Sequence, residues 1–550
     1  MDYEPIIGLE VHTELKTRTK MFCDCLNDPN ETHPNTNICP VCLAHPGTLP
    51  VANKEAIEKV ILVGMALHAE IPEFSQFDRK NYFYPDLPKG YQISQYEHPL
   101  VRGGSLEFKI PAKGEARPGR QNSPPNADPP LAEKFKIIRI QRIHLEEDTG
   151  RLAHGTSDMG PASPKLQRGE HGTSTVDFNR AGIPLMELVT EPDVRSAEEA
   201  RRFAEELQLI IRYVGASDAD MEKGQMRVEA NVSLRPKGEK TFGTKVELKN
   251  INSFKFVASA IEYEIARQKK VLEGGGKVIQ ETRGWNEAEG ITVSQRVKEG
   301  ATDYRYFPEP DLPALLIDQK WMQSIRSKLT ELPDQKRARF AAEFGLDEKT
   351  TELFIRDPEL SNYFEKVISE TEEWIKSMGD KVDPHTRIST GAERQDGTRS
   401  RFGVGVDRVK AIKLVSNYLT GDLQRLRNET GSAMSDVIIT PENFAEFITL
   451  IYEGKLSSAA AKTVLETMFR TGADPTDVMR EKNLAQESSE GALREIAEKV
   501  VGENPEIVSA VRSGKANAVQ ALVGAAMKVS GGKGNPAVLR ELIEQIIKLG

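Results

Sequence analysis

The alternation of apolar and polar residues predicts a strand-rich first half of the chain. Short apolar runs such as residues 6–12 and 136–140 are interrupted by Gly, Pro and Asn, which predicts strands up to about residue 295. Residues 227–235 alternate polar and apolar over nine positions, as in a half-buried strand. A stretch with six prolines, 111–130, interrupts this half and is expected to form a surface loop.

Helical patterns dominate the second half, and one helix is already well marked in the first. A capping box, Ser196 to Glu199, begins that helix and Gly215 ends it. Beyond residue 406 we expect short amphipathic helices at 443–453, 457–471, 492–501, 505–513, 518–527 and 536–548. The predicted fold class is α+β, with domains at 1–295 (sheet-based), 296–405 (helical linker, with a polar loop at 385–401) and 406–550 (helical tail).

Composition narrows the class of protein. The chain has 550 residues, 38% of them hydrophobic and 29% charged, which is typical of a soluble multidomain protein. No apolar run reaches the length of a membrane span, and the start Met1 to Pro5 has no signal-peptide pattern, so we expect a cytoplasmic enzyme. The net charge of −9 argues against a generally basic nucleic-acid binder but permits a local basic patch.

The tail carries such a basic bias. Residues 504–550 contain six Lys or Arg against three Asp or Glu, and Lys515, Lys528 and Lys533 lie near glycines. Cations on flexible backbone suit contacts to phosphate. A solvated helical face is the alternative, and composition alone does not separate the two.

All four cysteines lie in two tight pairs, Cys23 with Cys25 and Cys39 with Cys42. Four soft ligands from two adjacent turns can close a tetrahedral zinc site. The alternatives are four reduced thiols, or disulfides, which would need an oxidising compartment.

Two groups of polar residues suggest a site for a hard cation. Glu10 and His12 are two apart on a predicted strand and therefore share a face. Three neighbouring carboxylates, those of Glu146, Glu147 and Asp148, repel one another. Binding of Mg²⁺ would relieve this repulsion, because that ion prefers oxygen ligands. Alternation places Glu147 on the face opposite its two neighbours, so which carboxylate meets Glu10 depends on where the strand ends or bulges. A solvated acidic turn is the alternative.

Three further segments are candidates for substrate contact. Residues 78–91 mix cations with aromatic rings, which can stack on bases or simply fill a core. The polar face of 227–235 and the run 247–253 can each line a pocket or face solvent. The chain has no phosphate-loop motif, no Gly-x-Gly-x-x-Gly fingerprint and no Gly-x-Ser-x-Gly elbow, and its cysteines look committed to metal, so we expect no glutamine-hydrolysing thiol.

Taken together, these segments resemble the B subunits of the aspartyl/glutamyl-tRNA amidotransferases, the GatB family. The matching runs, spread in order over essentially the whole chain, are 8–12, 78–95, 143–150, 177–187, 191–193, 247–254, 303–313 and the tail segment at 535–536.

The resemblance implies an antiparallel cradle with the active site, a helical linker and a YqeY-like tail that contacts tRNA. Members act with an amidase subunit (GatA type), which frees ammonia from glutamine, and a small subunit (GatC type). The ammonia travels to the GatB-type chain, where ATP and Mg²⁺ activate the side-chain carboxylate of mischarged Glu-tRNA(Gln) or Asp-tRNA(Asn) for amidation. The cysteines suit the zinc-bearing members, in which the zinc is structural.

Residue roles carried over from the family motifs begin with the metal. Glu10, His12 and Glu147 would hold Mg²⁺, with Glu146 and Asp148 as neighbouring candidates. A separate set would meet the substrates: Lys80 and Tyr82 near the aminoacyl end, Arg227, Glu229 and Asn231 at phosphate or ribose, Lys249 and Asn250 on the path of ammonia, and Lys515, Lys528 and Lys533 at tRNA.

Two alternative functions stay open, and two segments differ from the usual pattern of the family. The archaeal GatE-type protein carries an added synthetase-like domain, for which this chain has no room, and a non-catalytic tRNA-binding scaffold would not need the acidic residues. The Pro-rich stretch and the loop 385–401 both look longer than usual for the family. The choice between Glu-tRNA and Asp-tRNA depends on the synthetases of the host.

Overall fold

The computed structural model describes residues 2–28, 30–110, 134–154, 174–297, 304–379, 408–485, 490–513, 517–531 and 533–549. The Pro-rich stretch 111–130, the loop 385–401 and Lys515 lie outside the described residues. The chain forms two compact units, unit 1 (Met1–Pro333) and unit 2 (Asp334–Gly550). The predicted domain boundaries near 295 and 405 stay predictions.

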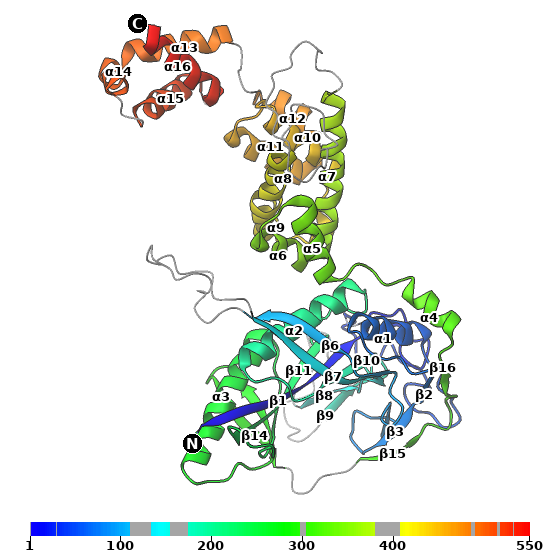
Figure 1. The fold of residues 1–550 in the computed structure, drawn as a ribbon. Helices are drawn as coiled ribbons and strands as arrows, with labels where there is room; N and C mark the ends of the chain where they lie inside the picture. The colour runs from blue at the N-terminus through cyan, green and yellow to red at the C-terminus, as the bar shows by residue number, and fades with distance from the viewer. Residues whose placement is uncertain are drawn as a thin grey trace, which may run out of the picture. The chain divides into compact units, whose positions relative to one another are not determined.

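Unit 1 is built on a nine-stranded sheet in the order β14-β13-β12-β11-β1-β10-β7-β5, with β6 also paired to β7 (Figure 1). Its pairs are antiparallel, except that β12 and β13 run parallel. The strands are β1 Tyr3–Glu14, β5 Val101–Arg102, β6 Ser105–Ile110, β7 Lys134–Glu147, β10 Pro184–Thr190, β11 Met226–Pro236, β12 Val246–Lys249, β13 Glu281–Asn286 and β14 Ile291–Val297.

Smaller sheets accompany the large one, and the class is α+β as predicted. The strands of the smaller sheets are β2 Phe74–Ser75 with β16 Leu315–Leu316, β3 Asp78–Asn81 with β4 Tyr91–Ser94 and β15 Arg305–Pro308, and β8 Arg151–His154 with β9 Ser174–Asp177.

The two faces of the large sheet differ because side chains alternate along each strand. Leu9 and Val11 of β1 are buried in the main core, together with apolar residues of β7, β10 and β11. Three helices cover this face: α1 Lys54–Ala66 contacts β7, α2 Ala197–Tyr213 contacts β6 and α3 Phe254–Glu273 contacts β11 (Figure 1). The other face of β1 carries Glu10 and His12. The three helices do not cover this polar face, which is therefore the candidate position of a site.

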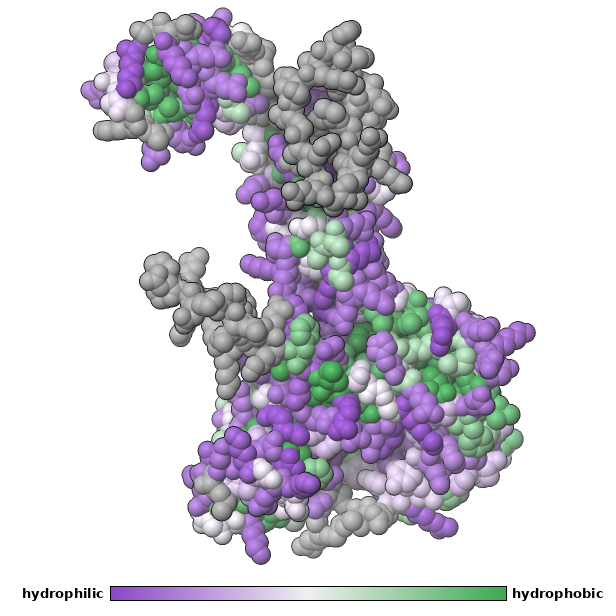
Figure 2. All heavy atoms as spheres, in the orientation of Figure 1, coloured by the Kyte–Doolittle hydropathy of each residue, from purple (hydrophilic) through white to green (hydrophobic). Residues whose placement is uncertain are grey.

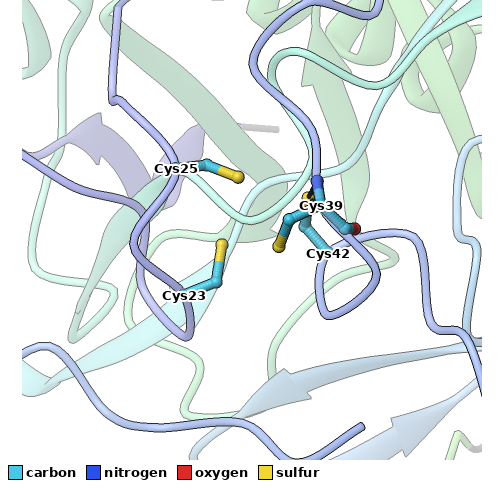
Figure 3. A group of neighbouring side chains, drawn as sticks. All are labelled: Cys23, Cys25, Cys39 and Cys42. Carbon is cyan, nitrogen blue, oxygen red and sulfur yellow. Dashed lines mark hydrogen bonds between the residues drawn. The ribbon is translucent and has the colours of Figure 1, made fainter.

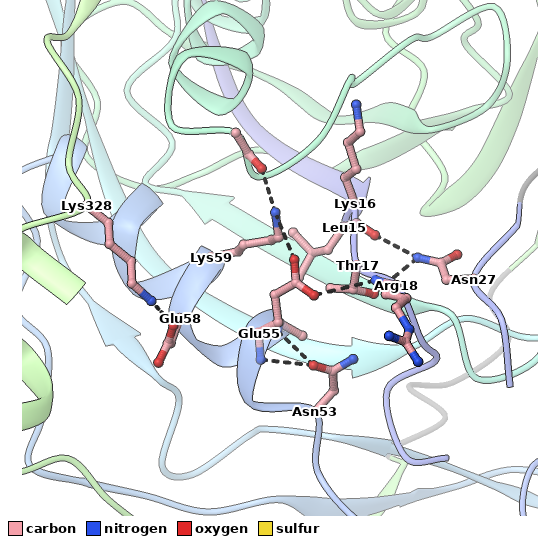
Figure 4. Close-up of polar contacts among 12 residues, drawn as sticks. Leu15, Lys16, Thr17, Arg18, Asn27, Asn53, Glu55, Glu58, Lys59 and Lys328 are labelled. Carbon is pink, nitrogen blue, oxygen red and sulfur yellow. Dashed lines mark hydrogen bonds and ion pairs between the residues drawn. The ribbon is translucent and has the colours of Figure 1, made fainter. Parts of the chain in front are cut away.

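Polar contacts fix α1 in place (Figure 4). The Asn53 side chain accepts hydrogen bonds from the amides of Glu55 and Ala56 at the start of α1. Its amide nitrogen donates to the carbonyl oxygens of Thr19 and Lys20, in the loop after β1. Asn53 therefore joins a helix start to the segment that leads to the cysteines.

A second contact attaches α4 (Gln319–Arg326) to α1. The Glu58 carboxylate accepts from Nε1 of Trp321 in α4 at 2.8 Å. It also lies 2.5 Å from Nζ of Lys328, which follows α4 (Figure 4). Figure 2 shows a mostly hydrophilic surface, with hydrophobic side chains gathered near β2 and β16, where Phe74 and Leu316 are exposed.

Unit 2 is helical, and its described residues form two hydrophobic cores, one from Phe340 to Val478 and one from Leu493 to Ile547. Its elements are α5 Pro333–Phe344, α6 Glu348–Arg356, α7 Pro358–Gly379, α8 Arg408–Asn417, the π-helix η1 Tyr418–Leu423, α9 Gln424–Thr430, the 3-10 turn η2 Met434–Asp436, α10 Pro441–Tyr452, α11 Ser458–Thr471, α12 Pro475–Glu481, α13 Glu490–Glu503, α14 Pro505–Arg512, α15 Ala518–Val529 and α16 Pro536–Leu549. Among the described helices, none is long and apolar enough to cross a membrane.

Candidate active site

A row of four polar side chains crosses the face of the large sheet opposite helices α1, α2 and α3. The strand register places Arg227 of β11 opposite His12 of β1, His12 opposite Glu187 of β10, and Glu187 opposite His144 of β7. Directly opposite residues of neighbouring strands point to the same face. The row is therefore set by backbone pairing.

Glu187 is the centre of this row. Its Oε2 lies 3.3 Å from His12 Nε2 and 3.3 Å from His144 Nε2. Glu10 Oε1 and Glu146 Oε1 approach His12 Nε2 to 3.8 and 3.7 Å. Ligand atoms of Glu10, His12 and Glu187 lie within 4.8 Å of one another, as do those of His144, Glu146 and Glu187, so either set can hold a hard cation. We name these five residues the carboxylate–histidine cluster.

Mutual charge shifts the pKa values within the cluster. Burial alone would lower the pKa of His12, but the hydrogen bond and charge of Glu187, with Glu146 and Glu10, raise it to about 9. Burial would raise the pKa of Glu187, but the two histidines hold it well below the usual value. Desolvation, and then the charge of Glu187, raise the pKa of Glu10 to about 7. Without a metal, the cluster therefore holds protons that a bound cation would replace.

Glu14 is a further carboxylate on the same face of β1. Burial and then the charge of Asp148 raise its pKa to about 7, against the opposite effect of Arg180 and Arg227. Asp148 Oδ2 lies 3.3 Å from Arg180 Nε and 3.5 Å from Arg227. These contacts place the predicted residues Asp148 and Arg227 beside the cluster.

Glu147 is not brought together with Glu10 and His12, contrary to the ligand set carried over from the family motifs. Alternation along β7 turns it away from Glu146, which takes the position next to His12. Its carboxylate accepts from Lys89 Nζ at 2.7 Å and from the amide of Ile93 at 2.9 Å. Glu147 instead lines a cavity of about 210 Å³ that also borders Cys23 and Cys42.

Lys80 and Tyr82 border the cluster from the small sheet of β3, β4 and β15. Burial would lower the pKa of Lys80, but Glu146 leads the charges that raise it above its usual value. Its Nζ lies 5.0 Å from the ring centre of Tyr304, and the rings of Tyr82 and Tyr304 are 5.4 Å apart. In such a group the cation can neutralise a phosphate while the aromatic rings stack on a base.

The other predicted substrate residues divide into two groups. Lys249 Nζ lies 2.8 Å from Glu229 and 3.4 Å from Glu247, which places both Lys249 and Glu229 in a charged network beside Glu10. Asn231 is half-buried on β11, opposite Gly8. Asn250 is exposed after β12 with φ of 59°, a turn position that asparagine tolerates.

Sequence reasoning missed three members of this site: Glu187, His144 and Glu14. Glu187 is a charge inside the otherwise apolar run 184–189, and that mismatch is a signal for a functional residue. His144 shares the alternation of Glu146, and Glu14 that of Glu10 and His12, so period two could have found both. Strand pairing, by contrast, cannot be read from either segment alone.

The four cysteines form a compact group in which the sulfur atoms point toward one another from two loops (Figure 3). Their Sγ atoms lie within 4.8 Å of one another, and the amide of Cys39 donates to Cys42 Sγ at 3.1 Å. A side-chain hydrogen bond from Cys23 is the main cause that lowers the pKa of Cys42, to about 5. The group is compatible with metal binding.

In the tail, Lys528 is exposed after the middle of α15 and Lys533 is half-buried beyond its end. Among the described residues of the tail, neither lysine has an ion-pair partner. Both remain predicted tRNA contacts.

Two family models match this chain. Residues 5–323 match the family model "GatB/GatE catalytic domain", and residues 402–547 match "GatB domain". The chain belongs to the GatB family. All members of the carboxylate–histidine cluster lie within the first match.

Relatives in the GatB family align over almost their whole length. The B subunit of the aspartyl/glutamyl-tRNA(Asn/Gln) amidotransferase of Thermoanaerobacter pseudethanolicus is 42% identical over 545 residues, which cover 99% of each chain. The proteins of the same name from Persephonella marina and Brevibacillus brevis are also 42% identical, over 548 and 547 residues, covering 100% and 99% of each chain.

Proposed function

We propose that this chain is the transamidating subunit of a tRNA-dependent amidotransferase of the cytoplasm. Its substrates are mischarged Glu-tRNA(Gln), Asp-tRNA(Asn) or both, with ATP and ammonia. The side-chain carboxylate of the aminoacyl group attacks the γ-phosphorus of ATP, and ADP leaves. Ammonia then attacks the acyl phosphate, phosphate leaves and a proton is released, which yields the amide.

The observation that carries this proposal is the buried carboxylate–histidine cluster on the face of the large sheet opposite the helices. A carboxylate is a poor electrophile, and its activation depends on positioning and on neutralising phosphate charge. Lys80, buried beside Glu146 and the rings of Tyr82 and Tyr304, supplies a fixed cation at the edge of the cluster. Arg227 and Arg180 supply two more around Asp148.

We assign the cation-binding role to Glu10, His12 and Glu187, with Glu146 and His144 beside them. The crowded carboxylates and the raised pKa of Glu10 fit a site that is completed by a hard cation such as Mg²⁺. When bound, the ion supplies charge neutralisation for phosphate oxygens. Glu187, held between two imidazoles, orients His12, and Ser94 donates to Glu146 at 3.3 Å to hold that carboxylate in place.

Glu147 and Lys89 form an ion pair beyond the cluster, and we assign them to the cavity beside the cysteines rather than to Mg²⁺. Lys249 and Glu229 line the other side of the cluster, where polar groups can guide ammonia. The four thiolates fit a structural Zn²⁺ site because the donor set is soft and closed.

The proposed partners are an amidase subunit, which releases ammonia from glutamine, and a small third subunit. The described part of unit 1 offers no cysteine outside the metal-compatible group, which supports a separate source of ammonia. The helical tail would hold the tRNA, with Lys528 and Lys533 at its phosphates.

Reconstitution of the complex tests the function. With mischarged Glu-tRNA(Gln), ATP, Mg²⁺ and glutamine, we expect Gln-tRNA(Gln) and one ADP per amide formed. Omitting this chain should abolish both products while the amidase still binds glutamine. ADP formation that does not depend on mischarged tRNA, or amidation without this chain, would contradict the proposal.

A further inference from the structure

Lys20 is a lysine in the interior of unit 1, in the loop between β1 and the cysteines. It is 1% exposed and is among the largest fully buried side chains. A buried ammonium group is costly unless an anion compensates its charge. The contacts of this one side chain therefore show which group near it is negative.

The Lys20 ammonium has two polar neighbours among the described residues. Its Nζ donates to the carbonyl oxygen of Phe178 at 3.2 Å and lies 3.9 Å from Cys42 Sγ. No carboxylate of the part that the structure describes lies within ion-pair distance of it. The carbonyl oxygen is only a dipole, so Cys42 is the one group among the described residues that can carry a negative charge within 4 Å of the ammonium.

We propose that Lys20 is the charge-compensating residue of a tetrathiolate metal centre and connects that centre to the acidic turn of the active site, the turn at Asp148 that follows β7. Four thiolates around a divalent ion carry a net charge of about −2, and a buried cation beside Cys42 offsets part of it. The inference rests on the proposed zinc site, but not on amidotransferase activity.

The link to the active site runs through the loop that precedes β10. Lys20 binds the carbonyl oxygen of Phe178 in this loop, and the amide of Met21 donates to Gly182 at 2.7 Å. The amide of Gly182 donates to the carbonyl oxygen of Asp148 at 2.9 Å, and the amide of Asp148 donates to Ile183 at 2.8 Å. Four hydrogen bonds thus connect the segment beside the cysteines with the end of β7.

Gly182 adopts a backbone conformation that favours glycine, and it lies in contact with both Lys20 and Cys42. Its φ is +85°, a conformation that other residues rarely adopt, and a Cβ there would lie 3.6 Å from Lys20 Cδ and 3.7 Å from Cys42 Cβ. The loop, the lysine and the cysteine group are therefore packed as one body.

Metal retention in the full-length chain tests the charge role. The variant K20M removes the ammonium and keeps the length of the side chain, and K20Q is a second neutral variant if K20M does not fold. We expect zinc release to a chelator to be about tenfold faster or more in the neutral variant. The control K16M, which loses an exposed ion pair to Asp218, should release zinc as the wild type does.

Cobalt substitution separates charge from packing. We expect the thiolate-to-cobalt charge-transfer band to shift in the neutral variant, because the ammonium acts on the sulfur electrons. Unchanged zinc release would overturn the proposal, and so would faster release with an unshifted band, since the latter indicates packing alone. A wild-type chain that binds neither zinc nor cobalt would overturn the metal site and this inference with it, while leaving transamidation to its own test.

Hydrogen exchange tests the link to the acidic turn. Removing zinc from the wild type should speed amide exchange at Asp148 and Gly182, and the neutral variant should show the same change. Exchange at these two amides that does not respond to zinc would refute the link.

Discussion

At the scale of the residue, Glu187 determines how the polar face of the sheet is organised. One carboxylate contacts two imidazoles, and each of those is a direct cross-strand neighbour. Removing its charge leaves His12 without its main partner, and the raised pKa of His12 depends on that partner. Loss of the Glu187 charge should therefore disrupt the whole carboxylate–histidine cluster and not one contact alone.

The variant E187Q tests this dependence. We expect amidation of Glu-tRNA(Gln), measured with ammonium chloride in place of glutamine, to fall by about 100-fold or more, as when a group that stabilises transition-state charge is lost. The control E107Q changes an exposed glutamate of β6 and should keep wild-type activity. Wild-type rates in E187Q would show that Glu187 does not serve the reaction.

The pKa values predict how Mg²⁺ binding depends on pH. The pKa of Glu10 is raised to about 7 and that of His12 to about 9, so protons occupy the site below these values. Mg²⁺ affinity should increase as pH rises from about 6 to 9, with protons released on binding. Titration calorimetry in two buffers of different ionisation enthalpy measures both quantities, and a pH-independent affinity would contradict the prediction.

The same shifts predict the stability of the metal-free protein. Both pKa values exceed the ordinary values of 4.5 and 6.5, so folding is favoured while the groups are protonated. This stability is complete below the ordinary values and is lost as pH rises through about 7 for Glu10 and about 9 for His12. Thermal melts of unit 1 should therefore decline over this range and recover with Mg²⁺.

The sequence predicts those parts of the site that depend on local patterns along one strand. Alternation placed Glu10 with His12 and separated Glu147 from Glu146, and both statements hold in the structure. The meeting of Glu187 with His12 depends on the antiparallel pairing of β1 with β10, about 175 residues apart in sequence. Such a register is long-range information that a single segment does not contain.

At the scale of the element, the ends of helices were predicted better than the elements against which the helices pack. Ser196 does cap α2, because its Oγ accepts from the amide of Glu199. The return bond of the capping box, however, runs from the amide of Arg195 to Glu199. The six tail helices that were expected match α10, α11 and α13 to α16 to within a few residues, since caps and apolar spacing are local. The helices α8, α9 and α12 were missed.

The cap of α1 is the element-scale prediction. N53A removes two accepted and two donated backbone hydrogen bonds, so we expect a loss of about 1–2 kcal/mol in unit 1, measured by urea denaturation and hydrogen exchange of α1. The matched control is N517A, because Asn517 stands at the N-cap of α15 with no side-chain cap bond. Equal effects of the two variants would contradict the account.

At the scale of the whole molecule, the chain consists of two compact units. Unit 1 holds the cluster, the cysteine group and the charged network, and unit 2 holds the predicted tRNA contacts. The α+β class and the three predicted domains both followed from length and from the patterns along the chain, and the family resemblance implies the same three parts.

Salt dependence tests the role of the tail. The double variant K528Q/K533Q should weaken binding of tRNA and reduce the slope of log affinity against log salt by about one for each phosphate that a lysine no longer neutralises. K349Q, on an exposed position of α6, is the control. A slope equal to that of the wild type would exclude these lysines from the tRNA contacts.

The central claim is that the carboxylate–histidine cluster holds a divalent cation. Crystals of the complex grown with Mn²⁺ and a non-hydrolysable ATP analogue would locate the ion by anomalous scattering. The account predicts a peak bounded by Glu10, His12 and Glu187, and its loss in E187Q. A peak beside Glu147 and Lys89, or none within reach of Glu187, would contradict it.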